Sequence, residues 1–220
     1  MRGLIMAAQQ QQRDDVWLYK GVVWDWGEVT NPVTGRIWMD RNLGAAGVST
    51  APNTEYGDLF QWGRLDDLHQ NRTSSLTAVN DLSTTDIPGH PNFILTSGSP
   101  NDWRQPQNDN LWQPSTRINL PAPKGWRVPT VAEWQAELAT WSSQNRDGAF
   151  SSVLVLPRSG YRRESVGDFI GRNNFAYYWS CDVRGIVSDS LYFDTSVAEI
   201  RAGTDGRRAR GHAVRLIKEL

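Results

Sequence analysis

The sequence contains a single cysteine, Cys181, in 220 residues. A lone cysteine cannot form an internal disulfide, and it excludes a zinc site built from several cysteines. The three histidines, His69, His90 and His212, lie far apart without the spacing of paired metal ligands. We therefore expect loop or surface histidines, no metal site, no cofactor, and a fold stabilised by its core.

The chain also lacks a net excess of charge and a long hydrophobic run. It has 23 Lys and Arg against 24 Asp and Glu, so no overall field would concentrate nucleic acid or an anionic membrane. No apolar run approaches the roughly 20 residues that span a bilayer. The apolar patch within residues 1–15 is too short for a secretion signal. We expect a soluble chain that neither binds nucleic acid nor inserts into a membrane.

Tryptophan, in contrast, is abundant, with 11 residues. Trp combines a large buried area with one directed hydrogen bond, and large rings are usually buried. The hydrophobic fraction of 39% excludes 19 glycines, and together they reach the usual share of a globular protein. The length suits one large domain or two small ones. A packed core that contains most of the tryptophans is expected.

Four segments of the first half have distinct patterns. Residues 1–19, with the run QQQQ, are typical of a flexible arm. Residues 22–43 carry apolar runs on both sides of NPVTG, which predicts a hairpin. Residues 55–69 indicate a short half-buried helix or an irregular segment. Residues 70–120 are polar but contain spaced large apolar side chains, so we expect a long ordered loop. Its anchors are Phe93, Trp103, Leu111 and Trp112.

The stretch PKGWRVPTVAEWQAEL, residues 123–138, predicts a helix that begins at Val131. Thr130 precedes Glu133 by three positions, which is the spacing of a capping box. One apolar stripe at helical spacing consists of Val131, Trp134, Leu138 and Trp141. We interpret Glu133 as a cap and Glu137 as part of a solvated face. Neither is expected to be catalytic.

Short β-rich runs follow this helix. They span residues 151–162, 176–183, 188–195 and 212–220, separated by Gly, Asn, Asp and Arg. One or two helices followed by many short strands predict an α+β fold with short antiparallel strands and long irregular loops.

Seven segments, in order, resemble the Fibrobacter succinogenes major paralogous domain, a C-type-lectin-like fold related in architecture to the formylglycine-generating enzyme. The segments are GRIWMDRNLGA (35–45), EYGDLFQWGR (55–64), NDWRQPQNDNLWQ (101–113), PKGWRVPTVAEW (123–134), SGYRRESVGDF (159–169), YYWSC (177–181) and GHAVRLIKEL (211–220). The resemblance implies one C-type-lectin-like domain over residues 20–220, with paired first and last strands.

Two positions depart from this family. Members commonly carry a cysteine between the prolines before GWR and another in the last strand, and the resemblance implies that the two are bridged. Ala122 and Leu216 stand at these places here. The joint loss fits folding in a reducing cytoplasm. A bacterial surface lipoprotein would keep the bridge, whereas a phage virion protein assembled in the host cytoplasm need not, so we expect a virion location, with the bacterial cell surface as the alternative.

The same fold serves as the display scaffold of variable proteins made by diversity-generating retroelements. In residues 171–211 and beyond, the period-two burial rule for strands separates framework from display positions. The framework residues are Tyr178, Trp179, Leu191, Phe193, Ala198 and Val214. The ligand-binding residues, expected to face outward or occupy loops, are Asn173, Asn174, Phe175, Asp182, Arg184, Ile186, Ser188, Asp189, Tyr192, Asp194, Val197, Glu199 and Arg201. Aromatic and Arg side chains would be anchors, with Ser, Asn and Asp as the rim.

The resemblance thus implies a non-enzymatic receptor-binding domain that presents its C-terminal surface to a cell-surface protein or glycan. The N-terminal arm would attach it to a carrier virion or to sister subunits, including a homo-oligomer. A bacterial adhesin is one alternative, and a formylglycine-generating type of enzyme, which would use Cys181, is another. Because Cys181 follows YYWS in a predicted strand and has no evident base partner, we expect a small buried thiol and no catalytic residue.

Two polar clusters have alternative interpretations. Residues 99–110 hold five Asn and Asp side chains, whose oxygens calcium accepts. The segment lacks a Glu-Pro-Asn type of sugar-binding motif, however, and turn formation explains these residues. Arg207, Arg208 and Arg210, with Arg201 nearby, could meet a phosphate or an acidic glycan, or could form a solvated turn.

Overall fold

The computed structural model describes residues 17–220. Most of the expected arm, residues 1–16, lies outside the described residues. Its last residues belong to the folded domain, since Trp17 and Tyr19 are buried. Strand β1 (Leu18–Tyr19) pairs with β2 (Val22–Val23). The predicted boundary at residue 19 is therefore wrong, because two large aromatic side chains before it pack into the core.

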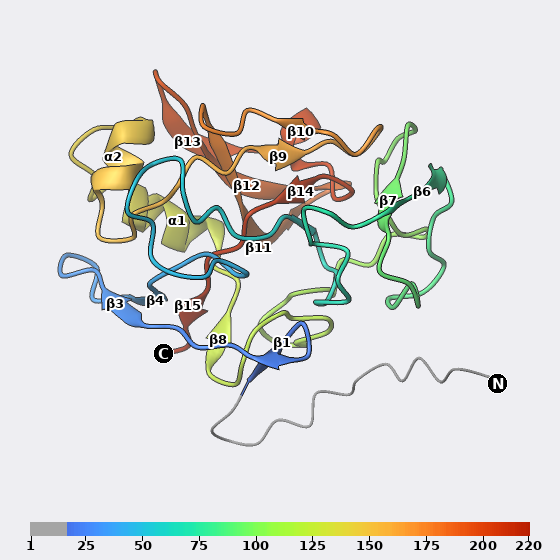
Figure 1. Ribbon diagram of the computed structural model, residues 1–220, viewed down its shortest axis with the longest axis horizontal. Coiled ribbons are helices and arrows are strands. Elements are labelled where there is room, and N and C mark those ends of the chain that lie inside the picture. Colours follow the sequence, from blue (N-terminus) through green and yellow to red (C-terminus); the bar gives the residue numbers. More distant parts are fainter. Residues whose placement is uncertain (1–16) are drawn as a thin grey trace.

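The C-terminal half forms an antiparallel sheet with two helices against one face. The sheet has the order β11 (Ala176–Arg184), β12 (Val187–Phe193) and β13 (Ala198–Arg201). Helices α1 (Val131–Leu138) and α2 (Arg146–Ser151) lie together at one end of the molecule in Figure 1. One hydrophobic cluster joins this sheet to both helices. It contains Trp134, Ala149, Ala176, Tyr178, Leu191 and Phe193.

A second sheet brings the two ends of the described chain together. Its order is β3 (Glu28–Thr30), β4 (Ile37–Met39), β15 (Ile217–Lys218) and β8 (Trp126–Arg127), all antiparallel. The hairpin predicted within residues 22–43 is thus confirmed. The last strand also pairs with an early strand, β4, whereas the resemblance implies pairing with the first strand; the first described strand, β1, pairs with β2.

Six further strands form one four-stranded sheet and one two-stranded sheet. One sheet has the order β10 (Phe169–Ile170), β9 (Tyr161–Arg162), β14 (Gly211–His212) and β5 (Phe60–Gln61), and β6 (Leu76–Val79) pairs in parallel with β7 (Phe93–Leu95). A short 3-10 helix, η1 (Gly203–Gly206), follows β13. Small antiparallel sheets with two helices among the described residues make this an α+β protein.

The long loop is ordered by buried aromatic anchors, as predicted. Phe93, Trp103, Leu111 and Trp112 are at most 2% exposed. Trp103 Nε1 donates to the carbonyl of Trp62 at 2.6 Å. A polar segment with such anchors can hold one conformation because each ring adds apolar burial and each indole N–H adds a directed hydrogen bond.

Helix α1 begins at Val131 with the predicted capping box: the Thr130 side chain accepts from Glu133 N, and Glu133 reaches back to Thr130 N at 2.9 Å. The expectation for Glu137 is wrong. Its side chain is 1% exposed and accepts from Asn31 Nδ2 at 2.7 Å, because this part of the helix faces the β3–β4 turn and not solvent.

The strand predicted over residues 151–162 is also wrong for most of its length, because only Tyr161–Arg162 is a strand. Ser151 still belongs to α2, whose N-cap Asn145 accepts from Asp147 N and Gly148 N. Leu154 and Leu156 are fully buried in the cluster below the sheet. The apolar run therefore reflects burial of an irregular segment. Nine of the 11 tryptophans are buried, as expected.

Candidate functional site

The face of the β11–β12–β13 sheet opposite α1 carries interlocking aromatic side chains. Tyr177 on β11 lies directly across from Tyr192 on β12, with ring centroids 4.7 Å apart. Phe175 contacts both rings, at 5.9 and 5.8 Å, and Tyr161 from β9 contacts Phe175 and Tyr177 at 6.2 and 5.6 Å. We call these four residues with Arg201 the aromatic face.

Arg201 covers the outer side of this cluster. Its guanidinium carbon lies 3.5 Å from the centroid of the Tyr192 ring. Its Nε donates to Glu199 Oε1 at 2.7 Å, and Nη1 lies 3.5 Å from Asp205 Oδ2. Burial, then the hydrogen bond to Asp194, raises the pKa of Tyr192 above its usual range, so its hydroxyl is a neutral donor. The partly exposed guanidinium of Arg201 therefore lies on a packed aromatic cluster, with the exposed carboxylate of Glu199 beside it.

The structure divides the predicted binding residues between two ends of the β11–β12 hairpin. One group surrounds the aromatic face. It contains Asn173, Asn174, Phe175, Tyr192, Asp194, Val197, Glu199 and Arg201. The other lies at the hairpin turn or the strand ends beside it. It contains Asp182, Arg184, Ile186, Ser188 and Asp189. The two groups do not form one patch.

Three of these residues are not outward-facing, and the expectation for them is corrected. Ser188 is fully buried where η1 packs on β12. Gly206 of η1 lies so close to Ser188 that a Cβ added at Gly206 would be 2.1 Å from the carbonyl oxygen of Ser188. Asp189 is 3% exposed, with its carboxylate held by Nε and Nη2 of Arg184 at 3.0 Å. Tyr192 is 6% exposed, because Arg201 covers its ring.

Asp182 has a structural contact that the sequence did not suggest. Its carboxylate accepts from the backbone N–H of Val131, the first residue of α1. An anion at a helix N-terminus satisfies a free donor and interacts favourably with the helix dipole. Asp182 is therefore a tertiary cap of α1. The predicted framework residues, in contrast, are all buried as expected; they are Tyr178, Trp179, Leu191, Phe193, Ala198 and Val214.

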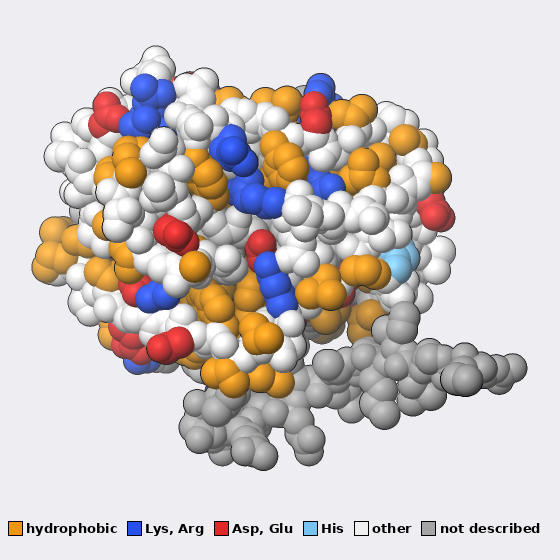
Figure 2. Space-filling model, viewed as in Figure 1, with side chains coloured by type: hydrophobic (Ala, Val, Ile, Leu, Met, Phe, Trp, Pro, Cys, Tyr) orange, Lys and Arg blue, Asp and Glu red, His pale blue; other side chains and the backbone are white. Residues whose placement is uncertain are grey.

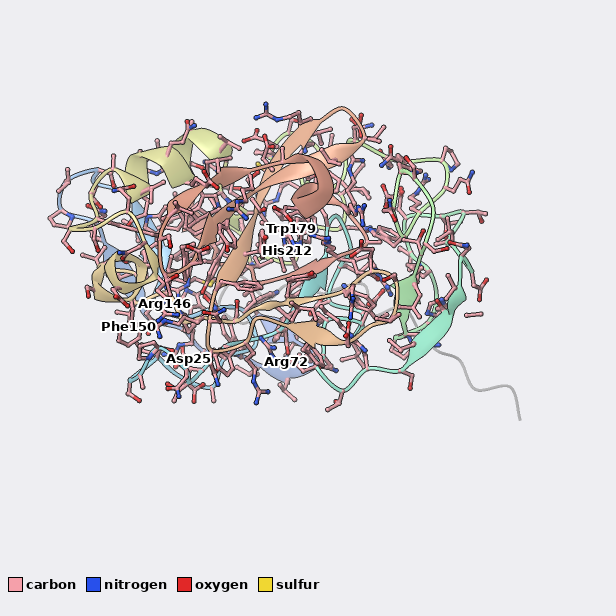
Figure 3. All side chains as sticks on the ribbon, turned by 90° about the horizontal axis from the view of Figure 1, so that it is seen from above. Asp25, Arg72, Arg146, Phe150, Trp179 and His212 are labelled. Atoms are coloured by element: carbon pink, nitrogen blue, oxygen red, sulfur yellow. The ribbon has the colours of Figure 1, made fainter. Side chains whose placement is uncertain are left out.

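A buried histidine lies under the aromatic face. His212 stacks between Trp179, at 3.9 Å, and Tyr177, at 4.8 Å, and Figure 3 shows His212 and Trp179 together in the middle of the molecule. Neither ring nitrogen has a hydrogen-bond partner among residues 17–220. Burial, and then the charge of Arg210, lowers the pKa of His212 well below its usual range, so the ring is neutral. The expectation of a loop or surface histidine is wrong, because β14 passes through the core.

His69 is also buried, contrary to expectation. Its Nε2 accepts from the backbone N–H of Gln61 at 3.0 Å, and its Nδ1 lies 2.6 Å from Asp67 Oδ1. Burial, followed by the charge of Arg64, lowers the pKa of His69 to about 4. Within residues 17–220 the structure contains no group of three or more His, Cys, Asp or Glu placed to hold a metal ion.

The Asn- and Asp-rich loop lines a cavity of about 420 Å³. Its polar wall includes Asn80, Thr96, Asn101, Asp102, Arg104 and Gln107. Asp102 is 3% exposed and accepts from Gln107 Nε2 at 2.9 Å, and burial raises the pKa of its carboxyl. Gln107 also donates to the carbonyl of Ile186 at 3.0 Å, so the cavity adjoins the β11–β12 turn. Such a wall suits a small polar molecule.

The basic cluster near the C-terminus is an ion-pair network and not a solvated turn, which corrects that interpretation. Arg208 is fully buried, with Nη2 2.7 Å from Asp109 Oδ1. Arg210 is 8% exposed and its Nε lies 2.9 Å from Glu164 Oε2, which also pairs with Arg207 through its other oxygen. These charges are compensated inside the fold.

Cys181 is a free, buried thiol, as expected for a strand residue next to the core. Burial, then the charge of Asp182, raises the pKa of Cys181 to about 12. A thiol with such a pKa is protonated at neutral pH and is a poor nucleophile.

No protein-family model, no curated protein and no solved structure matches this chain. Among the described helices, none is long and apolar enough to cross a membrane.

Proposed function

We propose that this chain is a non-enzymatic recognition domain of C-type-lectin-like fold, which binds a cell-surface protein or glycan through the aromatic face. The observation that carries the proposal is the arrangement of β13, where the partly exposed Arg201 and the exposed Glu199 share a sheet face with the packed rings of Tyr177 and Tyr192. Binding surfaces are typically enriched in aromatic and Arg anchors surrounded by adaptable polar residues.

The surroundings of the aromatic face support this reading. Asn173 and Asn174 are exposed in the loop before β11, and Asp194 and Val197 form the turn between β12 and β13. Asn174 is anchored by Arg146, whose Nη1 donates to its side-chain oxygen at 3.0 Å. The loops are therefore attached to the helical end of the fold, and side chains there can change without loss of the framework.

The fold proposal is supported by the pairing of β4 with β15, which closes the domain, and by the one sheet on which α1 and α2 pack. Ala122 and Leu216 both belong to the hydrophobic cluster that includes Trp126, where apolar contact takes the place of a covalent bridge. We further propose a phage virion as the carrier. Fractionation that places the native protein in particles supports this setting, and its recovery only from the host envelope would exclude it.

The binding proposal is tested with fluorescently labelled protein on a glycan array and on a panel of intact bacterial cells. Arg201→Ala and Phe175→Ala should lower the signal on any surface that the unmodified chain binds. Lys218→Ala is the matched control, because Lys218 is an exposed cation paired with Glu28 in the terminal sheet. No bound surface at all, or equal loss in the control, would reject the aromatic face as the binding site.

A further inference from the structure

The arginines of this chain are almost all paired, and the exceptions gather in one place. In residues 17–220 all but four arginines lie within 4.0 Å of a carboxylate. The exceptions are Arg72, Arg162, Arg172 and Arg215. Arg215 is fully buried and donates to the carbonyls of Met39 and Leu154 in the core. The other three surround two aromatic rings.

Those rings are Tyr56 and Phe169. The guanidinium carbons of Arg72 and Arg172 lie 5.3 and 5.6 Å from the centroid of Tyr56. Phe169 has Arg72 at 5.7 Å and Arg162 at 5.4 Å. Arg72 therefore contacts both rings, with one further arginine on each side. Figure 2 shows Lys and Arg side chains with few acidic ones among them across the upper half of its face, where β9 and β10 lie in Figure 1.

Arg72 and Arg162 donate hydrogen bonds to uncharged backbone carbonyls and form no ion pair within 4.0 Å among residues 17–220. Arg72 donates to the carbonyls of Gly57, at 2.8 Å, and Ser159, at 3.3 Å. Arg162 is 4% exposed and donates to the carbonyls of Gly167 and Ser74. A carbonyl satisfies an N–H group but carries no net charge.

Arg172 is the most accessible of the three. It is exposed, and within the described part of the chain its guanidinium makes the ring contact with Tyr56 but no hydrogen bond or ion pair. Burial lowers the pKa of Arg72 to about 10; the charge of Asp58 opposes this shift, and the charge of Arg172 acts in the same direction as burial. Arg72 and Arg172 repel each other, and an anion bound at Arg172 would relieve part of that repulsion.

Nearby carboxylates are engaged elsewhere. Asp58 accepts from the hydroxyl of Tyr19 at 2.6 Å. Asp168, next to Phe169 in the sequence, holds Arg163 Nε at 2.8 Å. Glu55 accepts from the backbone N–H groups of residues 46 and 47. Asp58 offsets part of the charge of Arg72 from a distance, but none of these carboxylates forms an ion pair with Arg72, Arg162 or Arg172.

We propose that Arg172, together with Phe169 and Asn173, binds an acidic sugar through its carboxylate, and that the buried guanidinium of Arg72 adds positive potential at this site. Arginine is suited to a carboxylate because its planar fork can donate two parallel hydrogen bonds. The ring of Phe169 is 38% exposed and offers a flat apolar surface beside the cations. A pyranose acid has an apolar C–H face and one charged edge, which matches this pairing, whereas an acidic peptide has no flat apolar face.

Asn173 connects this site to the region around the aromatic face. Its side-chain oxygen accepts from the hydroxyl of Tyr56, which orients the ring between the two arginines. The acidic-sugar site shares Asn173 with the surface of the proposed function but uses different anchors. Its existence does not depend on binding at Arg201, and the two are tested with different variants.

The experiment is a titration of the full chain with sodium glucuronate, followed by ¹⁵N–¹H chemical shifts, with methyl glucoside as the neutral comparison. Arg172→Gln should weaken glucuronate binding by about tenfold or more, because a charge-assisted contact is lost. Arg163→Gln is the matched control: it removes the same charge from an exposed arginine nearby, but one already paired with Asp168. It should change the affinity less than about twofold.

Methyl glucoside should bind at least about tenfold more weakly than glucuronate. Chemical-shift changes of the same size and at the same concentrations with both sugars would overturn the proposal. The same holds if Arg172→Gln and Arg163→Gln weaken glucuronate binding equally. Tetraglutamate is titrated in parallel. Binding of tetraglutamate without binding of glucuronate would reject the sugar in favour of an acidic peptide. Because Arg201 is unchanged throughout, these outcomes leave the proposed function to its own test.

Discussion

The guanidinium of Arg201 lies over the ring of Tyr192, with its central carbon 3.5 Å from the ring centroid. The two residues occupy neighbouring strands, where Tyr192 pairs with Glu199 and Ser190 pairs with Arg201. Tyr192 is nearly buried, so the side chain available to a ligand is Arg201. The tyrosine acts as its support, because a cation over an aromatic face gains electrostatic attraction from the ring.

Arg201→Ala should therefore weaken ligand binding by about 1 kcal/mol or more, while the free energy of unfolding falls by no more than about 1 kcal/mol, the typical value of an exposed cation–π contact. Binding is measured on the cell or glycan surface that the unmodified chain recognises, and stability by urea unfolding. Tyr192→Ala provides the contrast, since it truncates a buried ring and should cost several times more stability. A stability loss in Arg201→Ala as large as that in Tyr192→Ala would contradict the assignment.

The prediction for Asp182 is the reverse of that for Arg201: its substitution should lower stability and leave ligand binding unchanged. Its carboxylate caps the first N–H group of α1, so Asp182→Ala should lower the free energy of unfolding by about 1 kcal/mol. Ligand binding at the aromatic face should not change. Urea unfolding and the surface-binding assay together separate the two roles. Glu199→Ala is the companion variant, expected to change binding and not stability; the reverse pattern would restore Asp182 as a contact residue.

The sequence predicts the buried framework residues better than the surface residues. Burial along a strand alternates with a period of two, whereas ion pairs and hydrogen bonds between side chains follow no such period. The strand alternation correctly identifies Tyr178, Leu191 and Phe193 as internal. The capping box correctly places the start of α1. The prediction that Ser188 and Asp189 face outward or occupy a loop is wrong, because a short 3-10 helix packs against Ser188 and Arg184 at the end of β11 holds Asp189.

The proposed acidic-sugar site could not be predicted from spacing, because Tyr56 and Arg72 lie about 100 residues before Phe169 and Arg172 in the sequence. The feature that distinguishes Arg72 and Arg172, the lack of a carboxylate within 4.0 Å in the described part of the chain, exists only in the folded chain. The buried histidines were missed for a similar reason. Nothing in the local sequence of His69 or His212 distinguishes a core ring from a loop ring.

His69 predicts how stability depends on pH. The folded protein holds its pKa at about 4, below the usual value of about 6.5, chiefly because the ring is buried. Between these values the unfolded chain binds a proton that the folded chain does not, so stability falls as the pH falls from about 7 to about 4. The loss from this residue is about 3 kcal/mol at most.

The hydrogen bonds explain the direction. Nε2 of His69 accepts from Gln61 N–H, so protonation there would place two donors against each other. His69→Gln should lower stability at pH 7 and flatten the decline between pH 7 and pH 4, measured by urea unfolding at a series of pH values. His90→Gln, the same change at a half-buried histidine, is the control. An unchanged slope in His69→Gln would show that other groups cause the acid sensitivity.

Trp134 tests whether the helix and the sheet share one core. Its ring is fully buried, packs 4.8 Å from that of Trp38, and donates through Nε1 to the carbonyl of Trp179 at 3.1 Å. Trp134→Ala should therefore lower the free energy of unfolding by about 3 to 5 kcal/mol, as for other large buried aromatic truncations. Trp24→Ala, at a half-buried tryptophan, should cost less. In urea unfolding, a loss in Trp134→Ala well below about 3 kcal/mol, and no larger than that in Trp24→Ala, would mean that the contacts of Trp134 with β4 and β11 add little to stability, and the rigid support assumed for Arg201 would be lost with them.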